Sequence, residues 1–287
     1  MEPLSANPAR KYRHISARHH PFRLRLGEVW RYRSLIWLFT KRNFKVTYKQ
    51  TVLGPVWLFL RPLLTSVMYA FVFGGIVNVN TEGVPQLLFY LSGTAVWSFF
   101  ASALSRNATV FTENAGVFGK VYFPRLTVPL SVTLSYAIQF LIQFVMVAAF
   151  LLYFVWRGEV SPNWWAFWVV PFVLLHIGLM GTGLGVIISS LTTKYRDLSV
   201  LVSFGVTLWM YATPIVYPLS TLSEGWMKSI IRLNPVTAPV ELFRFAVVGK
   251  GSVEPLYLAV SCAFTVLVLL GGIMIFNKVE RTFMDTV

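Results

Sequence analysis

The hydrophobic positions of this chain gather into long stretches, and the charged positions lie almost entirely between them. The stretches run over residues 53–78, 86–111, 127–156, 165–191, 198–219 and 255–277. Each one reaches or exceeds the roughly 20 residues that a helix needs to cross about 30 Å of hydrocarbon. Because lipid offers no partner for a free backbone group, the pattern predicts an all-α polytopic membrane protein with six transmembrane helices.

The segment before the first stretch has a helical period. On a helical wheel, Val29, Tyr32, Ile36, Phe39 and Val46 share one side, and Arg31, Lys41, Arg42, Lys45 and Lys49 share the other. This pattern predicts an amphipathic helix over residues 28–50 that lies in the membrane interface. The alternative is a plain extension of the first transmembrane helix. Gly54-Pro55 favours the interfacial helix because it breaks the chain between the two.

Two connections have patterns of their own. Residues 113–124 (ENAGVFGKVYFP) are short and amphipathic, and they predict either a docking helix for a cytoplasmic partner or an ordinary loop. Residues 220–254 contain a short apolar run that cannot span a bilayer, so they predict an external re-entrant region. We therefore divide the chain into a basic tail (1–27), the interfacial helix (28–50) and a transmembrane domain (51–287).

Composition adds a strong asymmetry of charge. The chain is 56% hydrophobic and carries a net charge of +14, and residues 1–52 hold 12 of its 25 Lys and Arg. A basic segment joined to a membrane span indicates topology and contact with lipid headgroups rather than nucleic-acid binding. With a cytoplasmic amino terminus, the inner segments carry 18 Lys and Arg and the outer segments carry 5, which favours cytoplasmic location of both termini.

The sequence lacks the usual signatures of catalysis. It contains no GxxxxGK[ST] phosphate loop, no HExxH and no paired Cys motif, and its acidic residues lie in the tail, in connections or at the ends of stretches. His176 is the only intramembrane His, and Cys262 is the only Cys. We therefore expect no catalytic residue, metal or cofactor on this chain, and we expect the energy for its work to come from a partner.

Two arginines lie inside hydrophobic stretches. Arg61 lies about a third of the way along the first stretch, and Arg106 lies close to the inner end of the second. An arginine in lipid is costly, so each side chain either reaches back to the inner face or points into a wet cavity.

The hydrophobic stretches are rich in aromatic residues. Tyr69, Phe73, Trp97, Trp209 and Tyr211 fall well inside the first, second and fifth stretches. Their rings either fill space against lipid or neighbouring helices, or they form a surface on which sugar rings stack. Because six helices pack into a solid bundle, a path for a polymer would have to form between two copies, so we expect a homodimer with twelve spans.

The carboxyl-terminal half carries motifs in a recognisable order. Residues 194–218 (KYRDLSVLVSFGVTLWMYATPIVYP) are followed by 232–244 (RLNPVTAPVELFR). They resemble the membrane permease of polysaccharide-exporting ABC transporters, which include O-antigen, capsule and teichoic-acid exporters. The elements that carry the resemblance are Tyr195, Arg196 and Asp197, then Pro214, Tyr217 and Pro218, then Asn234, Pro235, Glu241 and Arg244. The resemblance extends from about residue 28 to residue 287.

The resemblance implies partners and roles. A permease of this family is a homodimer that pairs with two separate ATPase subunits, which bind ATP and Mg, and its usual cargo is a lipid-linked polysaccharide. Residues 113–124 match the family's coupling helix, so Val117, Phe118 and Lys120 would touch the ATPase. The first and fifth spans line the family's channel. We expect Tyr69, Phe73, Trp97, Trp209 and Tyr211 to contact the glycan. Tyr195, Arg196 and Asp197 would stabilise the cytoplasmic end of the fifth span.

The resemblance predicts an O-antigen exporter subunit in a bacterial inner membrane. Arg61 and the basic tail before residue 28 depart from the family pattern. Three other functions stay open: a permease for another lipid or small molecule, a membrane-embedded enzyme of glycan assembly, and a passive channel or scaffold.

Overall fold

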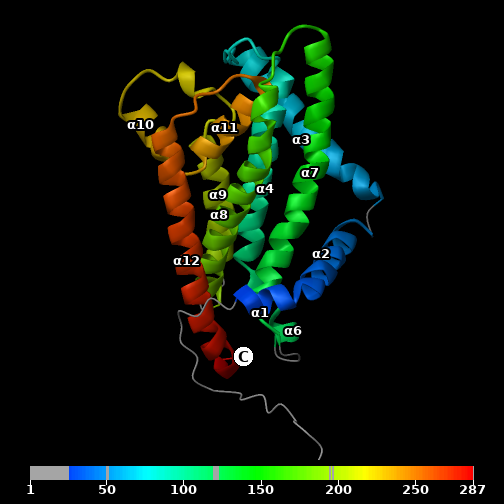
Figure 1. Ribbon diagram of the computed structural model, residues 1–287, viewed down its shortest axis with the longest axis vertical. Helices are drawn as coiled ribbons and strands as arrows, with labels where there is room; N and C mark the ends of the chain where they lie inside the picture. Colours follow the sequence, from blue (N-terminus) through cyan, green and yellow to red (C-terminus); the bar gives the residue numbers. More distant parts are fainter. Residues whose placement is uncertain (1–25, 50–51, 119–122, 194, 196, 287) are drawn as a thin grey trace, which may run out of the picture.

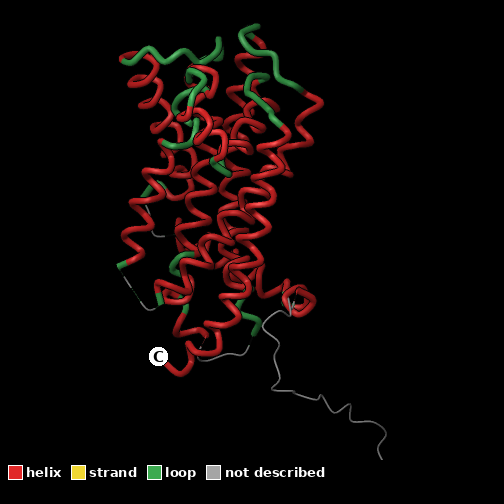
Figure 2. The backbone as a smooth tube through the Cα atoms, turned by 90° about the vertical axis from the view of Figure 1, so that its left-hand side faces the viewer, coloured by secondary structure: helices red, strands yellow, loops and turns green. Residues whose placement is uncertain are grey.

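The computed structural model describes residues 26–49, 52–118, 123–193, 195 and 197–286. Over these residues the chain is all-helical and contains no strand. Its long helices run side by side along the longest axis of the molecule (Figure 1), and the view from the side shows the same bundle (Figure 2). The predicted all-α fold is therefore confirmed.

Five helical segments of the described chain are long and apolar enough to cross a membrane. The first, Gly54–Ile76, joins the 3-10 turn η1 (Gly54–Val56), α3 (Trp57–Tyr69) and the π-helical η2 (Ala70–Ile76). The others are α4 (Gln86–Asn107), α7 (Thr127–Trp156), η3 (Trp164–Trp168) continued by α8 (Val169–Thr192), and α12 (Pro255–Thr286). They correspond to five of the six predicted stretches.

The fifth predicted stretch forms a shorter helix than expected. Helix α9 (Leu198–Tyr211) has 14 residues, or about 21 Å at 1.5 Å per residue. It ends eight residues before the predicted limit at residue 219, because Pro214 disfavours helical backbone at the residue before it and cannot donate a hydrogen bond. The chain continues through irregular backbone to η4 (Leu219–Thr221). The count of six spans therefore stays a prediction.

Helix α4 is the centre of the bundle, with 78% of its most apolar window buried. It packs closely on α8 through two glycines. A Cβ atom on Gly185 would lie 2.6 Å from the carbonyl oxygen of Leu104, and one on Gly181 would lie 3.1 Å from that of Phe100. Small residues let two helix backbones approach in this way, as is common inside membranes.

The amphipathic segment forms two helices, α1 (Leu26–Arg31) and α2 (Arg33–Tyr48). Helix α2 lies oblique to the bundle, near its lower end in Figure 1, and packs against α7. The Thr40 hydroxyl is within hydrogen-bond distance of the carbonyl oxygen of Ser131 on α7, at 3.3 Å. Val29 is buried, whereas Val46, on the same side of the helical wheel, is 73% exposed.

The remaining helices are short. Between α4 and α7 lie α5 (Val110–Glu113) and α6 (Ala115–Phe118), and between α9 and α12 lie α10 (Trp226–Leu233) and α11 (Thr237–Val248). Figure 1 places α10 and α11 at one end of the bundle and α2 and α6 at the other. Helix α11 packs against α4 and α8 inside the bundle. A segment that enters the bundle from one end without crossing it would form such contacts.

Candidate functional site

The aromatic residues predicted to contact a glycan mostly pack against one another. The Tyr69 ring centroid lies 5.8 Å from that of Phe73 and 6.2 Å from that of Tyr90, both edge to face. Phe100 joins the other two, with its centroid 5.4 Å from Trp97 and 5.3 Å from Trp209. These rings form two aromatic clusters, one between the first membrane segment and α4 and one between α4 and α9.

Tyr211 is the member of the predicted set with a freely exposed ring. Its side chain is 51% exposed, whereas Trp97 is 6% exposed and Trp209 is half-buried. The indole N–H of Trp209 donates to the side-chain oxygen of Asn234 at 3.0 Å, so that ring is fixed. Within one copy of the chain, Tyr211 is therefore better placed than Trp209 to meet a ligand.

Asn234 joins three elements near the end of the bundle that carries α10. Its side-chain oxygen accepts from Trp209 on α9 and from the backbone N–H of Val236 at 3.1 Å. Its side-chain nitrogen donates to the carbonyl oxygen of Ala212 and to the Thr213 hydroxyl, both at 2.9 Å. With Pro235 directly after it, Asn234 fixes the junction of α10 and α11 to the end of α9, and the carbonyl oxygen of Pro235 accepts from the Ser261 hydroxyl on α12.

Glu241 and Arg244 form a buried ion pair on α11. Their closest nitrogen and oxygen atoms lie 3.2 Å apart, and the side chains are 4% and 3% exposed. Arg244 also donates to the carbonyl oxygens of Pro214 and Ile215, and its guanidinium lies 3.9 Å from the centroid of the Phe89 ring. The carboxylate accepts from the backbone N–H of Ser252 at 3.0 Å. The pair therefore anchors α11 to the irregular backbone after α9.

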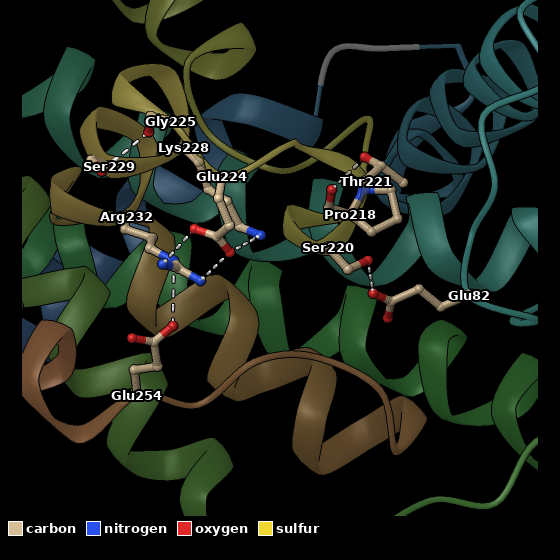
Figure 3. A network of polar contacts seen from close by, with 10 residues as sticks. All are labelled: Glu82, Pro218, Ser220, Thr221, Glu224, Gly225, Lys228, Ser229, Arg232 and Glu254. Carbon is tan, nitrogen blue, oxygen red and sulfur yellow. Dashed lines mark hydrogen bonds and ion pairs between the residues drawn. The ribbon is translucent and has the colours of Figure 1, made fainter.

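A second ionic network lies on the surface at the same end (Figure 3). Glu224 accepts from Lys228 at 2.8 Å and lies 3.5 Å from Arg232, which in turn lies 3.3 Å from Glu254. The nearby Lys228 and Arg232 charges lower the pKa of Glu224, with the Lys228 hydrogen bond as the largest cause. The network ties α10 to the segment that leads into α12, and Ser220 donates separately to Glu82.

The predicted coupling segment is anchored by Phe118. This side chain is 3% exposed and packs edge to face on Phe111, at 6.0 Å between centroids, and against Phe123. Phe118 therefore anchors the segment within this chain, and its expected contact with an ATPase stays a prediction. Val117 is half-buried, and Lys120 lies outside the described residues.

The motif before α9 is described in part. Asp197 occupies the N-cap position of α9, but its side chain forms no capping hydrogen bond, and Tyr195 is 51% exposed. Arg196 lies outside the described residues, so its expected pairing with Asp197 stays a prediction.

A cleft of about 690 Å³ opens between α3, α4 and α7. Arg61 and Arg106 both line it, together with Tyr69, Trp97 and Met210. The Arg106 guanidinium donates to the Tyr136 hydroxyl at 3.1 Å and lies 3.5 Å from the carboxylate of Glu113. Of the two alternatives for the intramembrane arginines, the geometry favours a cavity.

The cleft contains polar residues that our sequence analysis missed. They are Ser98, Ser102 and Ser105 on α4, and Gln139 and Gln143 on α7. Their spacing of four and three residues places each set on one helix face, so the signal was present in the sequence. What the sequence lacks is any sign that these two faces meet.

Comparison with known protein families matches residues 34–248 to the family described as ABC-2 type transporter. Three similar proteins are each named O-antigen export system permease protein RfbA. Two are from Klebsiella pneumoniae: one is 31% identical and one 29% identical, and each alignment covers 88% of this chain and 94% of the relative. The third, from Myxococcus xanthus, is 28% identical over 74% of this chain and 79% of its own.

Proposed function

The chain belongs to the ABC-2 type transporter family, and from this premise we propose that it is the membrane subunit of an ATP-driven polysaccharide exporter. The cargo is a lipid-linked polysaccharide, with O-antigen as the first candidate, and the site of action is a bacterial inner membrane. The observation that carries this proposal is the likeness to O-antigen export permeases over 88% of the chain. A local motif could not produce a match of that extent.

The active particle is a homodimer. Helix α9 buries none of its residues within one copy, and Val200, Leu201, Phe204 and Leu208 are each more than half exposed. The neighbouring α3 exposes Leu64 and Met68 in the same way. These faces can be covered by lipid or by a second copy, and the exposed Tyr211 at the end of α9 would then line a path between the two copies. The dimer therefore supplies the polymer path that one bundle lacks.

The energy comes from two separate ATPase subunits at the end of the bundle that carries α6. The short helices α5 and α6 are held by the Phe111, Phe118 and Phe123 cluster, which transmits movement better than a loose loop would. Val117 offers the contact surface, and ATP and Mg would be bound by the partner. Both termini lie on the same cytoplasmic side in this arrangement.

Deletion of the gene distinguishes polysaccharide export from the alternative functions. The gene would be deleted in its host, and surface polysaccharide would be examined on gels of extracted lipopolysaccharide. We expect loss of the long-chain ladder and accumulation of glycan inside the cell, with rescue by the wild-type gene. A permease for another lipid or small molecule would leave the ladder intact. A glycan-assembly enzyme would abolish the ladder without internal glycan, and either result contradicts the proposal.

A second measurement tests the need for an ATPase. The purified chain is reconstituted in vesicles with its cognate ATPase, and ATP hydrolysis is followed. We expect stimulation by the wild-type chain and weaker stimulation by Val117→Asp. The control is Val253→Asp, which makes the same change in the segment before α12, at the opposite end of the bundle. A passive channel or scaffold would give no stimulation.

A further inference from the structure

The cleft between α3, α4 and α7 is lined by polar side chains that lack partners. Within the described part of the chain, Arg61, Ser98, Ser102 and Gln139 form no hydrogen bond or ion pair. An unsatisfied polar group costs free energy at membrane depth, so such a set is expected to be occupied by water or by a ligand.

Other hydroxyl groups inside the bundle behave differently. The Ser92 hydroxyl donates to the carbonyl oxygen of Phe89 at 2.8 Å, and Ser131 donates to that of Val128 at 2.7 Å. These bonds satisfy the hydroxyls within their own helices. The hydroxyls of Ser98 and Ser102 form no such bond, so they are free to bind a group in the cleft.

The cleft also contains an unsatisfied acceptor. The side-chain oxygen of Gln143 is buried and has no hydrogen-bond partner among the described residues. A ligand that carries hydroxyl groups can donate to this oxygen and accept from the serines, because a hydroxyl does both. The lining is therefore suited to a sugar, whose hydroxyls alternate as donors and acceptors.

The charge of the cleft is concentrated at one end. Arg61 and Arg106 lie nearer to the end of the bundle that carries α2, and Arg42 lines an adjoining cavity of about 360 Å³ that shares Arg106 and Tyr136. Glu113 is the acidic residue among the described residues that line this adjoining cavity, where it faces Arg106. The positive excess favours an anion, and a guanidinium binds two phosphate oxygens at once.

The depth of these groups fits an amphiphile in the inner leaflet. Arg61 follows Gly54 by seven residues, or about 10 Å of helix, and Gln143 follows Thr127 by sixteen, or about 24 Å. The charged end thus lies in the half of the bilayer nearer to α2, and the uncharged polar part lies deeper, at or beyond the middle of the hydrocarbon.

We propose that this cleft binds the phosphate-bearing headgroup of a glycolipid. The phosphate lies on Arg61 and Arg106, and the first sugar lies deeper, on Ser98, Ser102 and Gln143. The inference rests on the proposed function, because it names the place where the lipid-linked end of the cargo binds before the glycan moves. The cleft contains Tyr69 and Trp97 but not Tyr211, so this entry site would lead into the path between two copies without including the exposed end of α9.

The test is a binding measurement on the purified full chain. The detergent is an amine oxide, which carries neither phosphate nor sugar. The probes are farnesyl diphosphate linked to N-acetylglucosamine, phosphatidylglycerol, and inorganic pyrophosphate, each titrated by microscale thermophoresis. We expect the glycolipid to bind most tightly. Equal binding of phosphatidylglycerol would assign the cleft to bulk phospholipid, and equal binding of pyrophosphate would reduce it to a free-anion site, so either result overturns the proposal.

Two variants sharpen the measurement. Arg61→Gln should weaken glycolipid binding about tenfold, because a charged hydrogen bond is lost, and Arg61→Lys should keep part of the affinity. The matched control is Arg157→Gln, since Arg157 is exposed at the other end of α7 and paired with Glu159 at 2.9 Å. Equal affinities of Arg61→Gln and Arg157→Gln, with unchanged melting temperatures, would overturn the site.

A third variant tests the sugar subsite. Ser98→Ala combined with Ser102→Ala should weaken binding of the glycolipid and leave binding of phosphatidylglycerol unchanged. An equal effect on both probes would overturn that subsite.

The experiments distinguish failure of the proposed site from failure of the proposed function. If gene deletion abolishes export while Arg61→Gln binds and exports normally, the site is wrong and the function stands. If Arg61→Gln loses binding while gene deletion leaves surface glycan intact, the site stands and the function is wrong.

Discussion

Two regions of this bundle carry intramembrane polar residues, and they differ in how those residues are satisfied. Around α11, Glu241 and Arg244 are buried against each other and against backbone groups, and Asn234 forms four hydrogen bonds. In the cleft between α3, α4 and α7, Arg61 and Ser102 have no partner in the described part of the chain. Both regions look alike in sequence, since each places polar residues in an apolar context.

The difference separates structural polar residues from ligand-binding ones. A buried charge whose partners come from the same chain fixes the fold, and removal of one partner leaves the other uncompensated. A polar group without a partner stabilises nothing in the free protein, so its replacement should cost binding rather than stability. Four measurements test this contrast.

The largest effect is expected at the buried ion pair. Arg244→Leu should destabilise the protein by about 3–5 kcal/mol, because Glu241 is left buried without a counter-charge. The fraction of folded protein after heating in detergent measures the effect. The matched control is Arg61→Leu in the cleft, for which we expect no loss. Combining Arg244→Leu with Glu241→Leu should recover part of the stability. Equal melting temperatures of Arg244→Leu and Arg61→Leu would refute the contrast.

Asn234 should give the next largest effect. Asn234→Ala leaves the indole N–H of Trp209 and the carbonyl oxygen of Ala212 without their partners, at a cost of about 1–3 kcal/mol. Thermal unfolding measures the loss. Asn80→Ala is the control, because the Asn80 side chain accepts one exposed hydrogen bond from the backbone N–H of Glu82. A loss no larger than that of the control would mean that the junction of α10 and α11 is held by other contacts.

The same substitution, serine to alanine, can be made once at a partnered hydroxyl and once at an unpartnered hydroxyl in the cleft. The Ser189 hydroxyl accepts from the buried backbone N–H of Phe111 at 3.2 Å, so Ser189→Ala should cost about 1–2 kcal/mol. Ser102→Ala removes an unpartnered hydroxyl and should stay within about 0.5 kcal/mol of wild type. Chemical denaturation of both variants, measured in parallel, compares them. A larger loss for Ser102→Ala would show that the cleft serves the fold.

The surface network should give the smallest effect, and it should depend on pH. Lys228 and Arg232 lower the pKa of Glu224, so its stabilising contribution is fully present above the ordinary carboxyl pKa. The contribution is lost as the pH falls through the lowered value. Melting temperatures of wild type and Glu224→Gln, measured from pH 7 downward, should therefore converge at low pH. A constant difference across that range would exclude this carboxylate as the cause.

The candidate site was only partly predictable from the sequence. The resemblance pointed to Asn234, Glu241 and Arg244, but their hydrogen bonds to the chain after α9 depend on how α11 folds back. For Phe118, the sequence could not distinguish a ring that faces a partner from one that packs on Phe111. The aromatic residues posed the same problem, because packing and stacking use the same side chains and the same helical spacing.

The sequence alone determined the all-α class, the position of most long helices and the family. Those properties depend on local apolar length and on short motifs, which neighbouring residues encode directly. The tertiary structure decided that α9 is short, that Trp209 is fixed by Asn234, and that the serines of α4 face the glutamines of α7. Each of these depends on contacts between residues far apart in the chain, and the free energy of such contacts is absent from any single stretch of sequence.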